Sequence, residues 1–593
     1  MCGIIGCISK NKNVIEKLKV GLKKLEYRGY DSAGISFFEK GKIKTIKKVG
    51  SVDNLFDDIK KNADIGIGHT RWATHGKPCT ANSHPHQSKN KKVCLVHNGI
   101  IENYIELKNT YLKNIKLKSQ TDTEIACNLI ELFLSKKNDK LFAINQATKL
   151  IKGSFAFAIL FDDEPDKIYF AKNKSPLLIG ISKTENYISS DILGFCNSIK
   201  KYVIIENGQI GYLTQNKVKI YDKSLNEINY QIKPVRKSLS DAEKQCYEYY
   251  MLKEINEIKS RLEFIDNLYQ SRKSPLNQLA MLKNKSINRI WLVGCGTSFH
   301  ACLVAEKFLK NFGFDATSQI ASEFIYSPPI LHKDVLCIFV SQSGETADTI
   351  SAINVAKQNG TKTLGITNVS TSQIASMCDF VLPICSGPEI AVASTKAYNC
   401  QIAVLYLLAN FLGGQDINVA TKNIKNISKL IDIPKFEKQI EPLIKDIIEA
   451  KNVFLCGKNF DYVTSLESAL KLKEITYINT QGIASGELKH GTIALVDNKT
   501  VVFAFATDPD LFEKTINIAN QTKARGAKIV AITNTKNKNL SQFDYVINLP
   551  TVEKELSPIV SIIPMQLLAY HTTLALGYNP DKPRNLAKSV TVE

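Results

Sequence analysis

A cysteine stands at position 2, in the opening stretch MCGIIGC. A cysteine thiolate is a strong nucleophile, and loss of Met1 would leave the α-amino group of Cys2 beside its own thiol, where it can act as a base. The other interpretation is structural, because cysteine is among the most buried residue types and could begin a buried strand. The position alone leaves both interpretations open.

Hydroxyl side chains crowd into the stretch VSQSGETADTI, between an apolar run and an apolar-periodic helix pattern. A single hydroxyl would suffice to cap that helix. Several hydroxyls around Gly344, where backbone N–H groups can approach a ligand, are typical of a phosphate cradle that works without a Walker lysine. Since the chain lacks GxxxxGK[ST], we expect the phosphate of a small metabolite, held by Ser341, Gln342, Ser343 and Thr346.

The stretch GCGTSFH contains a second candidate anion site. Its two glycines fit a dinucleotide fingerprint, but no third glycine follows between Phe299 and Ala301, which argues against a nicotinamide cofactor. Thr297 and Ser298 lie instead at an expected helix N-terminus, where backbone N–H groups and the helix dipole attract anions.

In SLESALKLKEI, the residues Glu467, Lys471 and Glu474 recur at spacings of four and three, which places them on one face of a helix. In isolation this pattern is typical of a solvated face with an i,i+4 ion pair. Carboxylates beside a lysine can also move protons and support imine chemistry. The spacing leaves both interpretations open.

The elements that must position these residues change in character along the chain. Up to about residue 225, short runs of alternating apolar and polar residues, separated by glycines, predict strands and hairpins with a few helices. Residues 226–282 form a polar linker in which the period lengthens to about 3.6, so a helical bridge is expected.

From about residue 283 the sequence predicts strand–turn–helix units, and they occur twice. RIWLVGCGTSF is echoed by VFLCGKNFDYV, and LGITN is echoed by VAITN. The long separation suits duplicated domains rather than a solenoid. Two doubly wound parallel α/β domains in tandem are therefore expected, with ligands at the carboxyl ends of their strands.

The composition is that of a globular enzyme, with 44% hydrophobic and 23% charged residues, and the length of 593 residues predicts about three domains. The net charge of +20 comes from lysines spread over every segment, which favours anionic small molecules rather than nucleic acid. The fourteen cysteines form no CxxC pair and no charged leader precedes the first strand, so a reducing, cytoplasmic location is expected. The two most apolar windows, CQIAVLYLLANFLGG and IVSIIPMQLLAYHTTLALGY, are too short or too interrupted to span a membrane.

The motifs together carry a resemblance to known families. SQSGET, with EIAVASTKA downstream, resembles the SIS (sugar-isomerase) domain, a phosphosugar-binding α/β module. MCGIIGC, LEYRGYDSAGI, GHTRWATHG, HPH, VHNGIIENY and TDTE resemble an N-terminal-nucleophile, class II glutamine amidotransferase domain. This domain followed by two SIS copies resembles the glucosamine-6-phosphate synthase family over essentially the whole chain.

The resemblance implies an α/β multidomain fold, in which an αββα sandwich precedes the two tandem parallel-sheet domains. It also implies conversion of fructose 6-phosphate and glutamine to glucosamine 6-phosphate and glutamate, the first step of hexosamine synthesis. The implied organisation is a glutaminase domain at 2–225, a linker and helical bridge at 226–282, SIS domains at 283–425 and 449–583, and a catalytic tail at 584–593.

For the glutaminase half, the resemblance makes Cys2 the nucleophile once Met1 is removed. The oxyanion of the tetrahedral intermediate needs donors, which the Asn98 side chain and the Gly99 backbone N–H would supply. Arg71 suits the α-carboxylate of glutamine and Asp122 its α-ammonium group. The rest of the implied glutamine-binding set is Trp72, which would gate an ammonia passage, with Thr74, His75 and Gly76.

For the SIS half, the resemblance implies that Glu474 shuttles a proton between C1 and C2 of the sugar, with Glu467 and Lys471 beside it. His490 corresponds to the ring-opening acid/base, which the family supplies from the partner subunit, so a homodimer is implied. Lys588 corresponds to the lysine that forms a Schiff base with the open-chain sugar. The implied sugar-phosphate-binding set adds Val392 and Ser394 to Thr297, Ser298, Ser341, Gln342, Ser343 and Thr346.

The chain departs from the family pattern at Phe299 and His300, and again at Thr492 and Ile493, and none of these carries an assigned role. No cofactor is implied, and no metal is assigned because His84 and His86 are not spaced with other ligands. The expected partners are the two substrates and a second copy of the chain, with no nucleic acid and no membrane. The alternatives are another class II glutamine amidotransferase, which should carry a phosphoribosyl-binding acidic motif, and a non-catalytic phosphosugar sensor, which would normally carry a DNA-binding module.

Overall fold

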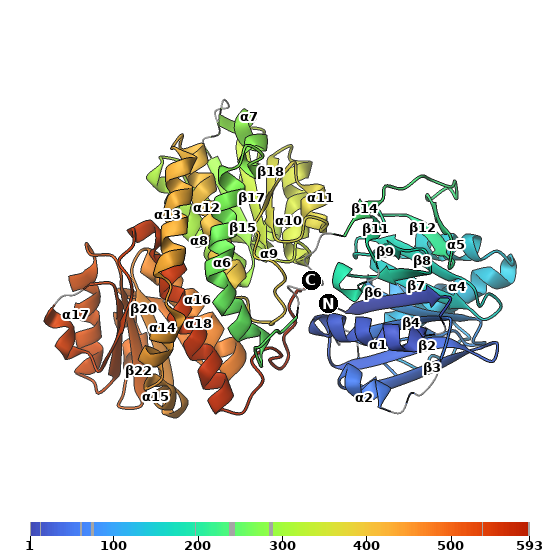
Figure 1. Cartoon of the computed structure of the whole chain (residues 1–593), viewed down its shortest axis with the longest axis horizontal. Coiled ribbons are helices and arrows are strands. Elements are labelled where there is room, and N and C mark those ends of the chain that lie inside the picture. The colour runs from blue at the N-terminus through green and yellow to red at the C-terminus, as the bar shows by residue number, and fades with distance from the viewer. Residues whose placement is uncertain are drawn as a thin grey trace. The chain divides into compact units, whose positions relative to one another are not determined.

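The structure is a computed structural model of the chain. It describes residues 2–590 except 12, 58, 60, 61, 73–75, 196, 198, 236–242, 284–286, 288, 536 and 537, so the predicted removal of Met1 falls outside the described residues. The chain divides into two compact units, Met1–Ala242 with Ser589–Val592, and Glu243–Lys588. Figure 1 draws the N-terminal part of the first unit from blue to green and the second unit from green to red.

The first unit contains two antiparallel sheets. The eight-stranded sheet has the order β14 (Lys233–Pro234), β11 (Lys201–Ile204), β9 (Leu178–Ile181), β10 (Glu185–Ser189), β1 (Gly3–Ser9), β4 (Ile65–Arg71), β2 (Ser32–Glu39) and β3 (Lys42–Val49). The six-stranded sheet has the order β13 (Val218–Tyr221), β12 (Ile210–Leu213), β8 (Ile168–Asn173), β7 (Gly153–Phe161), β6 (Val93–Ile101) and β5 (His86–Gln87). Because β14 pairs with β11, the sheet takes in residues beyond position 225.

Helices cover the outer faces of the two sheets. One buried cluster, with Ile4 and Ile8 of β1 and Val96 of β6, fills the space between the sheets. A second cluster packs α1 (Val14–Leu25) on the eight-stranded sheet, and a third packs α4 (Asp122–Lys136) and α5 (Lys140–Leu150) on the six-stranded sheet. Since β1 is covered on both sides, all of its residues are buried and it reads as a continuous apolar run. The unit is the predicted αββα sandwich.

The second unit contains two five-stranded parallel sheets with the same strand order. The first sheet runs β16 (Asp315–Ile320), β15 (Arg289–Gly294), β17 (Val335–Ser341), β18 (Lys362–Thr367) and β19 (Phe380–Pro383). The second runs β21 (Thr480–Ala484), β20 (Asn452–Gly457), β22 (Thr500–Ala506), β23 (Lys528–Thr533) and β24 (Tyr545–Asn548). The turns after β15 and β20 also match, since Gly296 and Asn459 have φ of 53° and 54°. The predicted duplication is therefore present in the backbone.

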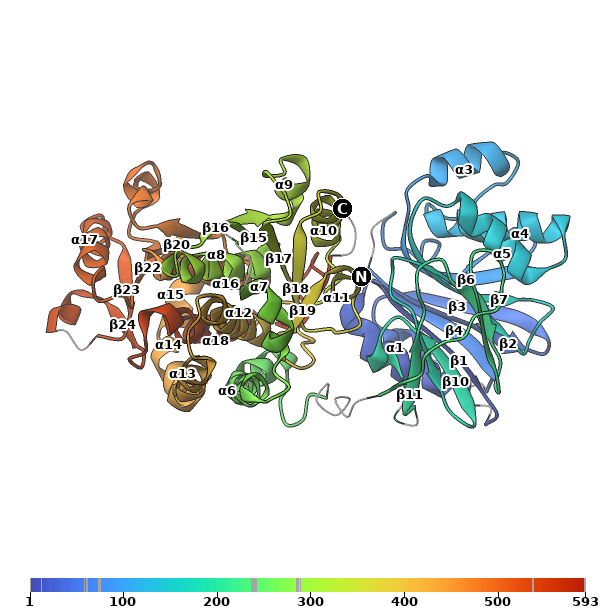
Figure 2. The same ribbon diagram turned by 90° about the horizontal axis from the view of Figure 1, so that it is seen from above.

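Four helices lie between the two parallel sheets, as Figure 2 shows. They are α8 (Gly296–Asn311), α12 (Lys396–Leu412), α16 (Phe460–Thr476) and α18 (Ser557–Ala575). One hydrophobic cluster runs through all of them and through both sheets, so the two copies share a core. None of the helices in the described part of the chain is long and apolar enough to cross a membrane.

The predicted helical bridge is α6 (Tyr250–Gln270). Its buried residues include Met251, Ile255, Ile258, Leu262 and Ile265, which recur at helical spacing and join the core of the second unit. The Asp581 carboxylate accepts hydrogen bonds of 2.9 Å from the first two N–H groups of α6, Tyr250 N and Met251 N. The segment predicted as a bridge is therefore an integral part of the second unit.

Candidate active sites

Cys2 lies immediately before β1 and is partly buried. Its Sγ lies 3.3 Å from the backbone N–H of Trp72, which donates to it, and 3.6 Å from the Trp72 carbonyl oxygen. Burial raises the pKa of the Cys2 thiol, while the Trp72 N–H and the Arg71 charge oppose that rise. The thiol is thus held at the end of the neighbouring strand β4, beside residues predicted to bind glutamine.

Asn98 on β6 lies next to the same cysteine. Its Nδ2 donates a 2.8 Å hydrogen bond to the carbonyl oxygen of Cys2, and its Oδ1 lies 3.1 Å from His69 Nε2. Gly99 follows with φ of 128°, and a Cβ there would lie 2.1 Å from the Ser154 carbonyl oxygen. Both the conformation and the lack of space therefore require glycine beside Asn98.

Arg71 ends β4 and Asp122 begins α4. Arg71 Nη2 donates a 3.2 Å hydrogen bond to the carbonyl oxygen of Gly76, and the Asp122 charge acts on the guanidinium. Asp122 Oδ2 accepts a 2.8 Å hydrogen bond from Ile101 N at the end of β6. The structure brings Cys2, Trp72, Asn98, Arg71 and Gly76 together through these contacts. Thr74 and His75 lie outside the described residues.

A cluster of buried histidines supports this site, and sequence reasoning assigned it no role. The rings of His69 and His84 stack with centroids 4.1 Å apart, and His86 meets His84 edge-on at 4.8 Å. His97 Nδ1 lies 2.9 Å from Thr123 Oγ1. Burial lowers the pKa of His69 to about 3 and lowers the pKa of His84 and His86 well below the ordinary value. Among the residues that the structure describes, no group of three or more His, Cys, Asp or Glu side chains is arranged to hold a metal ion.

In the second unit, the predicted phosphate cradle forms the loop after β17. Ser341 Oγ accepts a 3.0 Å hydrogen bond from Gly344 N and lies 2.9 Å from Thr346 Oγ1. Ser343 Oγ accepts a bond from Glu345 N at 3.2 Å, and the Gln342 carbonyl accepts one from Asn368 N at 3.2 Å. The loop leads into α10 (Ala347–Gln358), and it lies at the carboxyl end of the middle strand of the sheet, the usual ligand position in such folds.

Glu467, Lys471 and Glu474 lie together on α16, as their spacing predicted. Lys471 Nζ lies 2.8 Å from Glu474 Oε2 and 3.4 Å from Glu467 Oε1. Thr297 Oγ1, from α8 of the first copy, donates to Glu467 Oε1 at 3.0 Å and accepts from Lys471 Nζ at 3.1 Å. The side chains of Glu467 and Lys471 are fully buried, which excludes a solvated face. Burial raises the pKa of Glu474, and the Lys471 charge opposes that rise.

Lys588 is tied to this unit by Glu389, a residue that sequence reasoning missed. Lys588 Nζ donates to Glu389 Oε2 at 2.5 Å, and both side chains are almost fully buried. Ser394 Oγ donates to the same oxygen at 3.0 Å. Glu389 belongs to the EIAVASTKA stretch, but its contact with Lys588 spans 199 residues of sequence and has no local signal.

Three further predicted site residues are Ser298, Val392 and His490. Ser298 Oγ accepts a 2.9 Å hydrogen bond from Gln401 Nε2, and Val392 N donates to the Asp581 carbonyl oxygen at 3.1 Å. His490 is exposed after a short 3-10 helix at Glu487–Lys489. Within the described part of the chain, no hydrogen bond or ion pair joins the His490 ring to Glu467, Lys471 or Glu474.

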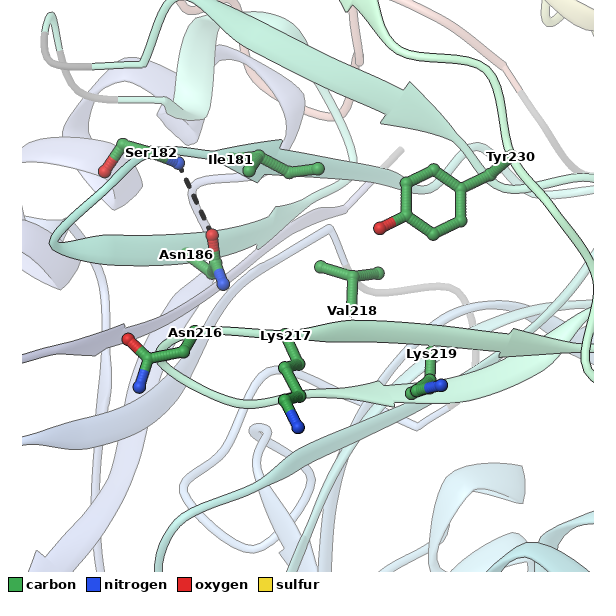
Figure 3. Close-up of a pocket in the computed structure, with 8 residues that line it drawn as sticks. All are labelled: Ile181, Ser182, Asn186, Asn216, Lys217, Val218, Lys219 and Tyr230. Atoms are coloured by element: carbon green, nitrogen blue, oxygen red, sulfur yellow. Dashed lines mark hydrogen bonds between the residues drawn. The ribbon is translucent and has the colours of Figure 1, made fainter.

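A cavity of about 230 Å³ lies elsewhere, at one edge of the first unit. Figure 3 shows its lining side chains, which come from the ends of β9 and β10, from the β12–β13 hairpin and from Tyr230. The Asn186 side chain within it accepts a 3.4 Å hydrogen bond from Ser182 N and donates to the Thr214 carbonyl oxygen. None of the predicted site residues lines this cavity, so it is not a candidate active site.

The fold and the two sites define a glutamine amidotransferase joined to a pair of SIS domains. The family model of the glutamine amidotransferase domain matches residues 69–197, and the SIS domain model matches residues 283–411 and 446–576. The chain is 40% identical to the glutamine–fructose-6-phosphate aminotransferase (isomerizing) of Fusobacterium nucleatum and 40% identical to that of Bacillus subtilis, over the whole of each chain. The chain belongs to the glutamine–fructose-6-phosphate aminotransferase (isomerizing) family, which confirms the resemblance and the fold class.

Solved structures agree for the second half of the chain. The C-terminal domain of glucosamine-fructose-6-phosphate aminotransferase from Francisella tularensis matches with a TM-score of 0.54 and 30% identity, over 57% of this chain and 99% of that one. The tagatose-6-phosphate ketose/aldose isomerase of Escherichia coli matches with a TM-score of 0.50 and 19% identity, over 57% and 96%. At that identity the second match supports the fold alone.

Proposed function

We propose that this enzyme transfers the amide nitrogen of L-glutamine to D-fructose 6-phosphate, giving D-glucosamine 6-phosphate and L-glutamate, the first step of hexosamine and UDP-N-acetylglucosamine synthesis. The observation that carries the proposal is the buried hydrogen-bonded cluster of Thr297, Glu467, Lys471 and Glu474, built across both parallel-sheet copies. The name shared by full-length relatives supports the same reaction.

In the glutaminase half, Cys2 becomes the N-terminal residue when Met1 is removed. Its thiolate attacks the side-chain amide carbon of glutamine, and its own α-amino group takes the thiol proton and returns it to the leaving ammonia. Water then hydrolyses the thioester, which releases glutamate and restores the Cys2 thiol. Asn98 Nδ2, which already donates to the Cys2 carbonyl, and Gly99 N stabilise the oxyanion. Arg71 binds the α-carboxylate of glutamine and Asp122 its α-ammonium group, with Trp72, Thr74, His75 and Gly76 completing the site.

In the isomerase half, the loop of Ser341, Gln342, Ser343 and Thr346 holds the sugar phosphate, together with Thr297, Ser298, Val392 and Ser394. The Lys588 amine adds to C2 of the open-chain ketose and water leaves, which forms an imine. Glu474 carries a proton between C1 and C2, and its place beside the buried Lys471 ammonium keeps it available as a base. Ammonia from Cys2 reaches C2 by an internal passage, which prevents its conversion to non-nucleophilic ammonium. There it adds to the imine carbon and the Lys588 amine leaves, so that the sugar keeps the new nitrogen and the lysine is free again.

The assembly and setting are part of the same proposal. The exposed His490 acts as the ring-opening acid/base in the site of a second copy of the chain, so the working unit is a homodimer without nucleic acid or membrane. The described cysteines are all free thiols, which supports a reducing, cytoplasmic setting. The glutaminase domain is proposed at 2–225 with the added strand β14 (Lys233–Pro234), the SIS domains at 283–425 and 449–583, and the catalytic tail at 584–593. Of the bridge proposed at 226–282, the helix α6 packs into the core of the second unit.

Isotope transfer tests the reaction directly. Incubation with fructose 6-phosphate and glutamine labelled with ¹⁵N in its amide should give ¹⁵N-glucosamine 6-phosphate and an equal amount of glutamate. Glutamate without aminosugar would contradict the proposal and favour another class II amidotransferase, and no turnover at all would favour a phosphosugar sensor.

One variant and one labelling experiment test the roles proposed in the two halves. Lys588→Ala should abolish aminosugar formation while glutamine hydrolysis continues, and unchanged synthesis would refute the role of that lysine. Mass spectrometry after reaction with a glutamine-analogue electrophile should place the adduct on an N-terminal Cys2. An adduct on a chain that retains Met1 would refute the α-amino base.

A further inference from the structure

His300, on α8 of the first SIS copy, makes a contact that no motif assigns. Its Nδ1 lies 2.7 Å from Glu467 Oε2, on α16 of the second copy. The His300 side chain is 15% exposed and that of Glu467 is fully buried. Because an ionised carboxylate only accepts hydrogen bonds, Nδ1 of His300 carries the proton in this contact.

The donors around Glu467 are divided between its two oxygens. His300 donates to Oε2, while Oε1 accepts from Thr297 Oγ1 at 3.0 Å and lies 3.4 Å from Lys471 Nζ. Lys471 keeps its shorter contact, 2.8 Å, for Glu474. The ammonium group is therefore shared unequally between two carboxylates on its own helix, in favour of the one proposed to move the sugar proton.

We infer that His300 is a positioning residue of the isomerase site. It donates a hydrogen bond to the Glu467 carboxylate and thereby leaves the Lys471 ammonium to pair with Glu474. The inference rests on the proposed function, in which Glu474 is the base. His300 touches Glu467 rather than the reacting atoms, so its effect is transmitted through Lys471.

The consequence is electrostatic. Glu474 faces Lys471 and Glu467 on α16 and Lys588 from the tail. Among the residues that the structure describes, His300, Tyr398 and Glu389 also act on Glu467 or Lys471. Without the His300 donor, Glu467 would draw Lys471 toward itself and the pKa of Glu474 would rise further. Since a base must be ionised to act, the acid limb of the proton-transfer rate would move to higher pH.

The test compares His300→Leu with His300→Asn in the full-length enzyme. Leucine removes the donor, whereas the Nδ2 of asparagine can take a place close to that of the histidine Nδ1. The rate of solvent-deuterium exchange at C1 of fructose 6-phosphate, measured without glutamine across pH, reports proton transfer alone. In His300→Leu the acid limb of the exchange rate should move about one pH unit higher, with about a tenfold slower exchange at pH values below it. In His300→Asn the acid limb should lie at the wild-type pH.

Two controls separate this effect from misfolding. Calorimetric titration with fructose 6-phosphate should give both variants the affinity of the wild type, because the phosphate loop is unchanged, and His300→Ser replaces the leucine variant if that one does not bind. A wild-type acid limb in the leucine variant would overturn the inference, as would an asparagine variant that matches leucine. Failure of the wild-type enzyme itself to form aminosugar would instead refute the proposed function.

Discussion

The side-chain amide of Asn98 donates a 2.8 Å hydrogen bond to the carbonyl oxygen of Cys2, across two different sheets of the first unit. His69 Nε2, which lies 3.1 Å from Asn98 Oδ1, determines which way the carboxamide points, because Oδ1 can only accept and Nδ2 can only donate. The Nδ2 donor is thus held at the Cys2 backbone before glutamine binds, and we propose that its second hydrogen bonds the oxyanion without reorganisation.

Replacing Asn98 with alanine should therefore slow glutamine hydrolysis by about 10²- to 10³-fold in kcat, with little change in KM, since the lost interaction strengthens in the transition state. Glutamate release at saturating glutamine measures the effect. Asn226→Ala, in an exposed turn of the same unit, is the matched control and should behave as wild type. A raised KM with unchanged kcat in Asn98→Ala would assign Asn98 to substrate binding instead.

The buried histidines of the first unit predict a loss of stability in acid. The folded-state pKa values of His69, His84 and His86 lie below the ordinary value of about 6.5, so the unfolded chain binds protons that the folded unit does not. Their contribution to stability is fully present above pH 6.5 and is lost as the pH falls toward the folded-state values. Each histidine gives a slope of about 1.4 kcal/mol per pH unit in that window.

Urea unfolding between pH 7 and pH 5 measures this slope. The chain has two tryptophans, one in each unit, so Trp291→Phe leaves Trp72 as the fluorescent reporter of the first unit. His84→Asn removes one titrating ring and keeps an acceptor for His97 N, which bonds His84 Nδ1 at 3.3 Å. In this variant the slope of the free energy of unfolding against pH should be smaller by the contribution of one proton. An unchanged slope would show that His84 does not take up a proton on unfolding.

Local sequence could predict the parts of the sites that are built by neighbouring residues. The loop from Ser341 to Thr346 is held by bonds that span two to five residues, so its composition and spacing already specify a cradle. The face of Glu467, Lys471 and Glu474 follows from helical period alone. That the two sheets of the second unit are parallel was likewise predictable, because alternating strand and helix patterns lead to parallel sheets.

The contacts that complete the sites could not be predicted in the same way. His300 meets Glu467 across 167 residues and Lys588 meets Glu389 across 199, and nothing in either local stretch specifies the partner. Asn459, at φ of 54°, takes the place that glycine takes in the first copy, so the fingerprint glycine marks only one of the two turns. Long-range pairing depends on how the two copies pack, which composition and period do not encode.

The Glu389 carboxylate should hold Lys588 in place. It accepts from Lys588 Nζ and Ser394 Oγ on one oxygen and from the backbone N–H groups of Thr395 and Ala397 on the other. Glu389→Gln breaks the buried ion pair with Lys588 and leaves Glu254 as an acidic group near that ammonium, which should cost the second unit about 3–5 kcal/mol. Aminosugar formation should fall with it, while glutamine hydrolysis, which uses the first unit, should stay at the wild-type rate.

The pH dependence of this effect has a definite sign. Burial raises the pKa of Glu389, but the Lys588 charge and the hydrogen bonds to the carboxylate outweigh burial and hold that pKa below the ordinary glutamate value of about 4.3. The stabilisation is therefore present above about pH 4.3 and is lost as the pH falls through the lower folded-state value. Denaturant unfolding followed by Trp291 fluorescence, with Trp72→Phe in both chains, should show a difference in the free energy of unfolding between Glu389→Gln and its parent at pH 7 and a smaller difference below pH 4. Glu449→Gln, whose ion pair with Lys445 is well exposed, should change stability by less than about 1 kcal/mol. Equal effects from the two substitutions would contradict a buried pair.

The phosphate loop depends on the absence of a side chain at Gly344. This residue has φ of 68°, and a Cβ there would lie 2.0 Å from Ser372 Oγ and 2.7 Å from Thr367 Oγ1. Its N–H donates to Ser341 Oγ and its carbonyl accepts from Ile374 N at 3.0 Å, so the backbone is held on both sides. Gly344→Ala must therefore displace Ser372 and Thr367 or shift the loop backbone, whose Gly344 N–H bonds Ser341, one of the hydroxyl groups proposed to bind phosphate.

We expect Gly344→Ala to weaken fructose 6-phosphate binding by about 10- to 100-fold, which corresponds to overpacking of about 1–3 kcal/mol, with glutamine hydrolysis unchanged. Calorimetric titration measures the affinity. Gly414→Ala is the matched control, because Gly414 also has positive φ, 75°, but nothing lies within 4 Å of its Cβ position. That variant carries the backbone strain of a left-handed alanine without the collision, so its sugar affinity should equal the wild-type value. If both variants weakened binding alike, strain spread through the unit would be the cause, whereas loss confined to Gly344→Ala assigns the phosphate to this loop.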